Sequence, residues 1–340
     1  MSNTLRKYLS LAKTELYRRP KEELHRMLRW GPKAYFLCDS WMKEMEEAAY
    51  RLEPIRKAEI RNKKSETSIG ADDQKPLDLR PSTFDSSPIS LWFMTGEKHW
   101  YQTAFCAWSF ARHSRHTIRP VLIDDGTLAE SSLSGLRRLF PDLIVDSRPE
   151  CDERVERLLP IASFPKIHWI RNKQKLFRKL TDIHAGASDW RLFFDSDMLF
   201  FKEPEEIDRY LDDPSGHLAQ RDCWESYGFS RGLTERLCGH RLPEALNIGI
   251  FSMNGSLIDW ERVEHWIGEM FGTEGSRYNV TQCTSAMLMA GRDLHVLDSE
   301  DYKVFPANPT RPHRPRVLEH YVQDSKPWYF GEAWKLAMNI

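Results

Sequence analysis

The sequence predicts an α/β fold, a mainly parallel β-sheet with helices on both faces, preceded by an N-terminal helical appendage. From residue 89 onward, short apolar runs alternate with amphipathic segments of helical period, which is the pattern of successive βαβ units. Residues 1–62 show only the helical period. The 340 residues, of which 41% are apolar, suffice for one large α/β core and an additional piece.

The N-terminal segment divides into a helical part and a polar part. Apolar side chains recur at helical spacing at Leu5, Leu9, Ala12 and Leu16, and again at Met42, Met45, Ala49 and Leu52. Residues 1–62 are therefore predicted to form a helical appendage packed on the main domain. The alternative is a basic face that contacts a membrane surface or a partner. Residues 63–88, rich in Ser, Asp and Pro, are predicted to be a linker or long loop.

The main domain, residues 89–340, begins with a regular alternation of elements. Strands are expected over 89–94, 120–123 and 143–145, and helices over 100–112 and 128–140. Further on, a basic amphipathic helix is expected over 170–183, followed by buried strands over 190–194 and 246–254 and an apolar helix over 286–289. Ligands of such sheets bind beyond the carboxyl ends of the strands, so those ends are the first places to search for a site.

Composition and charge exclude several classes of protein. The net charge of −1 disfavours a strongly basic nucleic-acid-binding protein. No apolar run approaches 18 residues, and no apolar signal segment follows the first basic residues, so neither a membrane span nor secretion is expected. The six cysteines form no C-x-x-C pair, which favours reduced thiols. We therefore expect a cytoplasmic protein, with peripheral membrane contact as the alternative.

Two strand ends carry small and acidic residues but no known phosphate-binding loop. They are Thr95-Gly96 and Asp124-Asp125, the latter followed by Gly126. Neither matches the G-x-G-x-x-G pattern of dinucleotide-binding folds, and no Walker A sequence is present. A dinucleotide cofactor is therefore not supported.

Asp195 and Asp197 follow the buried strand 190–194 with one small residue between them. Side chains two apart in a strand share a face, and two carboxylates there repel unless a cation lies between them. A hard divalent ion, Mg²⁺ or Mn²⁺, removes that cost and completes its coordination shell with substrate phosphates. The D-x-D pattern therefore predicts a metal–diphosphate site at this strand end.

Other interpretations of the D-x-D pattern fit less well. The residues after Asp197 are Met198, Leu199 and Phe200, which excludes a calcium EF-hand loop. A haloacid-dehalogenase-like phosphatase, with Asp195 as nucleophile, usually has Thr or Val where Leu199 stands. A solvated turn before a helix that starts near Pro204 remains an alternative.

With these residues in hand, the chain resembles glycosyltransferases of the GT-A fold. It resembles most of all glycosyltransferase family 8, the retaining glycogenin and lipopolysaccharide galactosyltransferase group. Three elements carry the resemblance: Phe194-Asp195-Ser196-Asp197, Asn247-Ile248-Gly249, and His320 followed by Lys326-Pro327-Trp328. The resemblance extends over about residues 89–335 and does not include the N-terminal helical piece.

The resemblance implies a role for each of twelve residues. The metal ligands, for Mn²⁺ or Mg²⁺, would be Asp195, Asp197 and His320. The expected donor is a nucleotide sugar of the UDP-sugar type, and contacts to it would come from Thr95, Gly96, Asp124, Asp125, Lys175, Asn247 and Lys326. Asp222 and Gln282 would lie nearest the anomeric carbon. The implied reaction is transfer of the sugar, with retention, to a saccharide or lipid-linked acceptor; no nucleic acid is expected as partner.

One departure from the family pattern is Thr281-Gln282, where the family usually has Asp-Gln. The contacts to the hydroxyls of the donor sugar are therefore expected to differ from those of the family. Two alternatives stay open at this point: the phosphatase above, and a non-catalytic carbohydrate- or nucleotide-binding module that retains the fold.

Overall fold

The computed structural model describes residues 19–55 and 87–339, so the expectations for residues 5–16 and 63–86 lie outside the described part. A seven-stranded sheet has the order β3-β2-β1-β4-β7-β6-β8. Only β7 runs antiparallel to its neighbours β4 and β6, and the other pairs are parallel, as predicted. The strands are β1 (Ile89–Thr95), β2 (Ile118–Asp124), β3 (Ile144–Asp146), β4 (Trp190–Phe194), β6 (His217–Arg221), β7 (Leu246–Asn254) and β8 (Leu294–Val296).

A second, three-stranded sheet lies beside the first. It consists of β5 (Met198–Phe200), β10 (Leu318–Asp324) and β9 (Tyr302–Ala307), in the order β5-β10-β9. The chain leaves the large sheet at the end of β4 and enters the small one at Met198, which pairs with His320 of β10 in antiparallel register. Residues 195–197 therefore connect the two sheets, and the small sheet brings His320 close to them.

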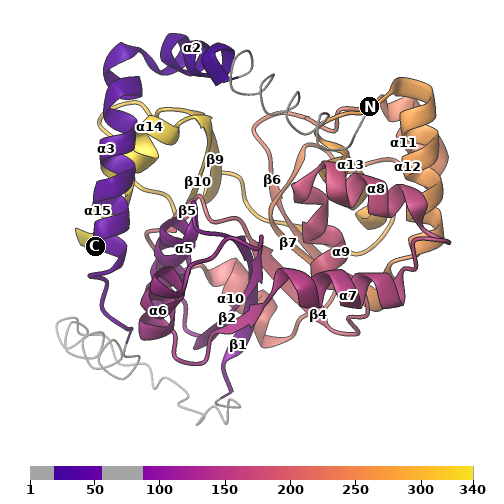
Figure 1. The fold of residues 1–340 in the computed structure, drawn as a ribbon, viewed down its shortest axis with the longest axis horizontal. Coiled ribbons are helices and arrows are strands. Elements are labelled where there is room, and N and C mark those ends of the chain that lie inside the picture. Colours follow the sequence, from indigo (N-terminus) through magenta and orange to yellow (C-terminus); the bar gives the residue numbers. More distant parts are fainter. Residues whose placement is uncertain (1–18, 56–86, 340) are drawn as a thin grey trace, which may run out of the picture.

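Helices cover both faces of the large sheet (Figure 1). Each face has its own apolar core. One core contains buried residues of α3, α5, α6 and α10 together with β5, β10 and the C-terminal helices. The other contains residues of α7, α8, α9, α11, α12 and α13. The bounds from α5 on are α5 (Trp100–His113), α6 (Glu130–Leu139), α7 (Arg148–Leu158), α8 (Pro165–Lys173), α9 (Arg178–His184), α10 (Glu205–Asp212), α11 (Arg231–Cys238), α12 (Trp260–Glu274), α13 (Val280–Met289), α14 (Lys326–Trp328) and α15 (Trp334–Asn339). Short helical turns are η2 (Lys175–Phe177), η3 (Gly255–Leu257) and η4 (Tyr329–Ala333).

The described N-terminal residues form two helices, α2 (Arg19–Trp30) and α3 (Pro32–Ala49). In Figure 1, α3 lies along one side of the molecule next to the C-terminal helices. Its residues Met45 and Ala49 are fully buried in the first core. Trp100 Nε1 of α5 donates a hydrogen bond to Glu46 Oε1 at 2.9 Å. Helix α3 therefore belongs to the core of the main fold.

The single helix expected over 170–183 is wrong. Helix α8 ends at Lys173, Gln174 is extended with φ −124° and ψ 100°, and η2 and α9 follow. Gln174 Nε2 donates to the carbonyl of Arg277 at 2.7 Å. Arg171 before the break and Arg178 after it both bind the buried carboxylate of Asp182. These long-range and buried contacts outweigh the helical propensity of the segment.

Other sequence expectations agree with the described residues. The strands and helices expected between 89 and 145 are present with bounds shifted by one to three residues. All six cysteines are free thiols. Within residues 19–55 and 87–339, no helix has both the length and the hydrophobicity needed to cross a bilayer.

Candidate active site

The turn that carries the two aspartates is fixed to both sheets. The Asp195 N–H donates to the carbonyl of Gly249 on β7 at 2.7 Å. The Tyr321 N–H of β10 donates to the carbonyl of Asp197 at 3.0 Å. The aspartates therefore lie between two strands of different sheets, and the expectation that they share one face of a regular strand is wrong. Their side chains converge because the turn is held from both sides.

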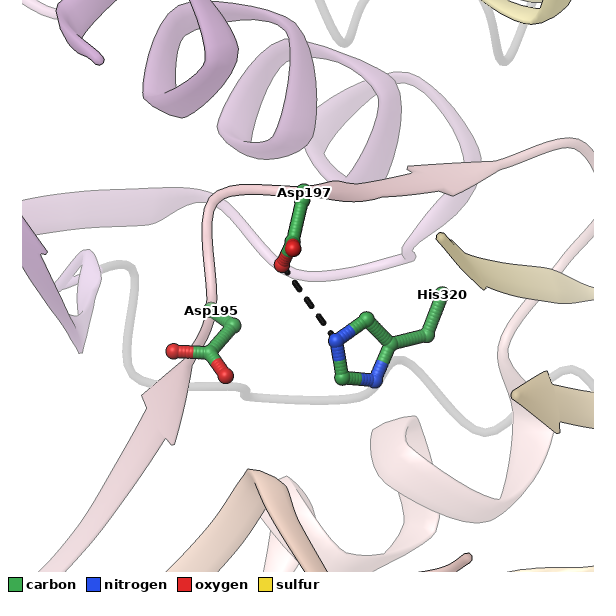
Figure 2. Close-up of side chains that lie close together, drawn as sticks. All are labelled: Asp195, Asp197 and His320. Carbon is green, nitrogen blue, oxygen red and sulfur yellow. Dashed lines mark ion pairs between the residues drawn. The ribbon is translucent and has the colours of Figure 1, made fainter. Parts of the chain in front are cut away.

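Asp195, Asp197 and His320 form one cluster (Figure 2). One ligand atom from each residue can be chosen so that all three lie within 4.8 Å of one another. Within the cluster, His320 Nε2 lies 3.3 Å from Asp197 Oδ1, close enough for an ion pair. His320 is buried, whereas both aspartates are partly accessible. Two carboxylates and an imidazole are ligands that Mn²⁺ accepts.

Gln220 of β6 orients the ring of His320. Its Nε2 donates to the carbonyl of Tyr302 at 3.1 Å, so its Oε1 is the atom that faces His320 Nδ1, also at 3.1 Å. The Nδ1–H of His320 therefore donates to Gln220, and Nε2 faces Asp197. In the neutral ring, Nε2 carries a lone pair directed at a carboxylate oxygen. This arrangement requires a cation or a proton between the two atoms, as in metal-bound histidines with an oriented second nitrogen.

Gly249 makes the close approach of His320 possible. A Cβ atom at this position would lie 2.4 Å from His320 Cε1 and 2.6 Å from Met198 Cε. Neither ring nor methyl group has room to move by the distance required, because both residues are fully or almost fully buried. The glycine inside an apolar strand, noted in the sequence, therefore marks the place where the imidazole lies against β7.

Two lysines bind the carboxylates of the cluster. Lys179 Nζ lies 2.5 Å from Asp195 Oδ1, and Lys326 is paired with Asp197. Burial raises the pKa of Asp197, but Lys326 and His320 outweigh it and hold this pKa far below its ordinary value. Asp197 is therefore ionised at neutral pH. Each carboxylate of the cluster therefore has an ammonium group as its counter-ion.

All twelve residues predicted from the sequence line one cavity of about 810 Å³. Its other charged lining residues are Lys98, Arg148, Arg178 and Lys179. The structure thus brings together side chains from β1, β2, β7, β10, α13 and α14, and from the turn 195–197 that follows β4. A cavity of this size can hold a nucleotide sugar.

At the β1–β2 end of the cavity, the predicted residues mostly form hydrogen bonds that hold the loop after β2 in place. Asp124 Oδ1 accepts from the N–H of Gly126 at 2.9 Å, and Asp125 Oδ1 accepts from the N–H of Thr127 at 3.1 Å. A Cβ on Gly96 would collide with the Asp125 carboxylate, at 2.1 Å. The Thr95 hydroxyl accepts from Thr103 and is buried. Backbone and the remaining carboxylate oxygens are thus the groups presented to a ligand here.

Lys175, predicted to contact the donor, lies at the rim. Its ammonium group is 3.8 Å from Asp125 Oδ2, and its side chain is 68% exposed. Lys179, one helical turn further on, is only 3% exposed and contacts Asp195. The buried cation of this segment is therefore Lys179, which sequence reasoning placed on the basic helix without a role.

At the β6–α13 end, Asp222 and Gln282 are hydrogen-bonded to each other. Gln282 Nε2 donates to Asp222 Oδ2 at 3.2 Å and to Ser226 Oγ at 2.9 Å. Asn247 Oδ1 accepts from the N–H of Gly249 at 2.7 Å, which leaves its amide nitrogen as the group to present to a ligand. These three predicted residues lie on the far side of the Asp195, Asp197 and His320 cluster from β2, since β4 separates β1 from β7.

Sequence reasoning missed several residues of the cavity. Besides Lys179 they include His99, whose pKa is lowered by burial and by Lys98. Gln220, which orients His320, is fully buried behind the lining and was missed as well. Tyr278 and Trp224 are exposed aromatic side chains in the lining. The role of Gln220 follows only from its contact with His320, 100 positions further along the chain, so no local pattern identified it. The position of Lys179 depends on the break at Gln174, which the helical periodicity concealed.

No family model matches the chain, and no curated protein matches it in sequence. The structure is similar to several solved glycosyltransferases. Mouse xyloside xylosyltransferase 1 is 13% identical with a TM-score of 0.48, covering 69% of this chain and 97% of that one. The galactosyltransferase LgtC is 15% identical with a TM-score of 0.46, covering 74% and 96%. The S. cerevisiae mannosyltransferase Ktr4p is 9% identical with a TM-score of 0.44, covering 76% and 84%.

Proposed function

We propose that this protein is a metal-dependent glycosyltransferase that moves a sugar from a UDP-sugar to a hydroxyl acceptor, with retention at the anomeric carbon. The observation that carries the proposal is the cluster of Asp195, Asp197 and His320 at the carboxyl end of a parallel sheet, inside a cavity large enough for a nucleotide sugar. Fold and ligand site coincide where α/β sheets bind nucleotides.

The residues of the cluster fit Mn²⁺ or Mg²⁺. The donor set is two carboxylates and one imidazole, and Gln220 holds the imidazole so that its Nε2 faces the aspartates. Asp195 and Asp197 would hold the ion by oxygen, and His320 by Nε2. A divalent cation bound there supplies positive charge to the diphosphate of the donor.

The residues of the chain complement the charge of the leaving group. Breaking the anomeric C–O bond leaves a nucleoside diphosphate with increasing negative charge. Lys326 and Lys179 lie on the two carboxylates of the cluster and, on binding of a cation, can turn to the diphosphate. Both ammonium groups are held close to the site before the reaction, so little reorganisation is needed.

Retention rests on the sequence resemblance to glycosyltransferase family 8, and the groups near the expected sugar position bear only on how it would be achieved. Asp222 is bonded to Gln282, Cys223 and Ser226, and no second carboxylate is predicted to oppose it for a double displacement. Attack of the acceptor hydroxyl on the face from which the diphosphate departs retains the configuration. Gln282 and Asp222 would lie next to the anomeric carbon in that arrangement.

The acceptor and the place of action stay predictions. A saccharide or lipid-linked acceptor and a cytoplasmic location follow from the sequence resemblance and composition alone. Leu24, Leu28 and Phe36 of α2 and α3 are exposed, which keeps the alternative of peripheral membrane contact open to test.

The proposal is tested by nucleotide binding with and without metal. Thermal shifts are measured with UDP, GDP, ADP and CMP, each with Mn²⁺ and with EDTA. We expect a clear stabilisation by UDP that disappears with EDTA, because the diphosphate binds through the cation. Hydrolysis of UDP-sugars then reports turnover. An equal response to all nucleotides, or none to UDP, would contradict the proposal.

The Asp197→Asn variant distinguishes the glycosyltransferase proposal from the phosphatase and the non-catalytic module. It keeps the size of the side chain and removes the charge that holds a cation, so metal-dependent stabilisation by UDP and turnover should be lost. Asp142→Asn, an exposed residue outside the cavity, is the matched control and should change neither. Phosphate release from phosphomonoesters without UDP affinity would favour the phosphatase alternative. UDP binding with no turnover of any UDP-sugar would favour the non-catalytic module.

A further inference from the structure

The start of α13 faces the cavity with three polar side chains, and two of them are already used. Asn279 Nδ2 donates to the carbonyl of Ser226 at 2.5 Å. Gln282 binds Asp222 and Ser226. These bonds attach the loop 222–226 to the helix. Thr281 stands between the two residues and lines the same cavity.

The hydroxyl of Thr281 has no hydrogen-bond partner, although the residue is only 2% exposed. A buried hydroxyl without a partner costs free energy, and where such a hydroxyl lines a cavity a bound ligand can supply the missing partner. The start of helix α13 also presents groups that need a hydrogen-bond partner. Asn279 does not cap α13 with its side chain, so backbone N–H groups at this end of a ten-residue helix also lack a side-chain acceptor. Both features favour a ligand atom that accepts hydrogen bonds.

The position of Thr281 along the sheet edge identifies the part of the ligand that it faces. The order of strands is β2, β1, β4, β7 and β6. The predicted nucleoside contacts follow β1 and β2, the metal cluster follows β4, and α13 packs against β7. A nucleotide sugar has the same order: nucleoside, diphosphate, sugar. The group at α13 is therefore the sugar.

We propose that Thr281 is a specificity-determining residue that donates a hydrogen bond from its hydroxyl to an acceptor oxygen on the transferred sugar. This inference rests on the proposed function. The recognised oxygen is a carbonyl or carboxylate oxygen, as in an N-acetylated sugar or a uronic acid, because the uncapped helix start favours groups that accept and carry negative charge. A carboxylate side chain at this position would repel such a group.

Thr284 provides a matched control. It lies on the same helix, is fully buried, and its hydroxyl also lacks a partner, but it does not line the cavity. Thr281→Val and Thr284→Val each remove one unpaired buried hydroxyl and keep the shape of the side chain. Neither change is expected to lower the melting temperature, so loss of folding does not obscure the result.

The test compares the affinities of UDP and UDP-sugars in Mn²⁺, without acceptor. The donors are UDP-glucose, UDP-galactose, UDP-N-acetylglucosamine and UDP-glucuronate; the last two distinguish the carbonyl from the carboxylate. We expect a UDP-sugar whose sugar carries a carbonyl or carboxylate oxygen to bind more tightly than UDP. Thr281→Val should reduce that gain roughly five-fold and leave UDP affinity unchanged, whereas Thr284→Val should preserve both. Thr281→Asp should reduce the gain further and shift the preference toward the sugars with hydroxyls only.

The outcomes separate the two proposals. Normal UDP affinity with an undiminished gain in Thr281→Val would overturn the role of Thr281 and leave the glycosyltransferase proposal standing. The role of Thr281 would likewise be overturned if the wild-type protein bound UDP-glucose or UDP-galactose more tightly than both UDP-N-acetylglucosamine and UDP-glucuronate. Failure of the wild-type protein to bind UDP with Mn²⁺ would overturn both.

Discussion

At the scale of single residues, the site depends on close approaches that leave no spare volume. Gly249 lets the ring of His320 lie against β7, and Gln220 fixes the direction of that ring. Each residue acts on the cluster of Asp195, Asp197 and His320 by positioning the imidazole. Such supporting contacts set the affinity of a site as much as the ligands do.

Gly249→Ala tests the close approach. The new methyl group would displace His320 from the aspartates, so we expect Mn²⁺ affinity to fall roughly ten- to hundred-fold. Titration calorimetry with Mn²⁺ measures it. Gly232→Ala is the control, because a Cβ there meets no atom within 4 Å. Equal Mn²⁺ affinity in Gly249→Ala and the wild type would show that His320 is not a ligand.

The burial of His217 is expected to lower the free energy of unfolding in acid. Burial lowers its pKa to about 4 from an ordinary 6.5, and its Nδ1–H donates to the carbonyl of Ser252. Since the folded-state pKa is depressed, the unfolded chain takes up the proton first as pH falls below 6.5. The stabilisation present at neutral pH is lost between about pH 6.5 and 4, with about 2 kcal/mol gone at pH 5.

His217→Asn keeps a donor near Nδ1 and removes the titration. Chemical denaturation at pH 7.5 and pH 5 gives the change in the free energy of unfolding. The variant should lose less stability between these pH values than the wild type, by about the same 2 kcal/mol. An unchanged pH dependence would mean that other groups, such as the buried His184 with its pKa lowered to about 3, account for it.

At the scale of elements, the break between α8 and α9 is the feature that shapes the site. Arg171 and Arg178 bind the fully buried carboxylate of Asp182 from both sides of the break, at 2.7 to 2.9 Å. The three charges lock α9 in its direction, and Lys179 follows Arg178 at once. The ion pair with Asp195 is therefore set by the anchoring of α9.

Asp182→Asn would leave two buried guanidinium groups with less compensation. Breaking a buried ion pair by removing one partner costs about 3–5 kcal/mol, so we expect a strong fall in the melting temperature. Glu153→Gln on α7 is the control, since Glu153 is exposed. A fall of similar size in both variants would contradict the role assigned to the Arg–Asp network.

At the scale of the whole molecule, the N-terminal helix α3 and the C-terminal helices share one core with β1 and α5. Arg138 of α6 donates to the carbonyls of Tyr50 and Leu52, which also holds the segment after α3 in place. Arg29 of α2 is paired with Asp324, next to the cavity-lining Gln323. We propose that residues 19–55 unfold together with the main domain as one cooperative unit.

Met45→Ala tests this unit. Met45 is fully buried, and truncation of such a side chain costs about 2–5 kcal/mol through lost burial and a cavity. A single cooperative transition at lower denaturant concentration is expected. Met338→Ala, at a 37% exposed position, should cost far less. A separate early transition in Met45→Ala would show that α3 unfolds independently.

The alternation of apolar runs and amphipathic segments determined the sheet, the side-chain chemistry at its strand ends and the D-x-D pair, because these signals are local and repeat with the period of each element. The folded chain alone decided which distant residues meet. Residue 320 reaches Asp197 through the pairing of β10 with β5, and Gln220 reaches His320 across both sheets. The helix break at Gln174 was hidden for the same reason: contacts between residues far apart in sequence outweigh local propensity, and no window of sequence contains both partners.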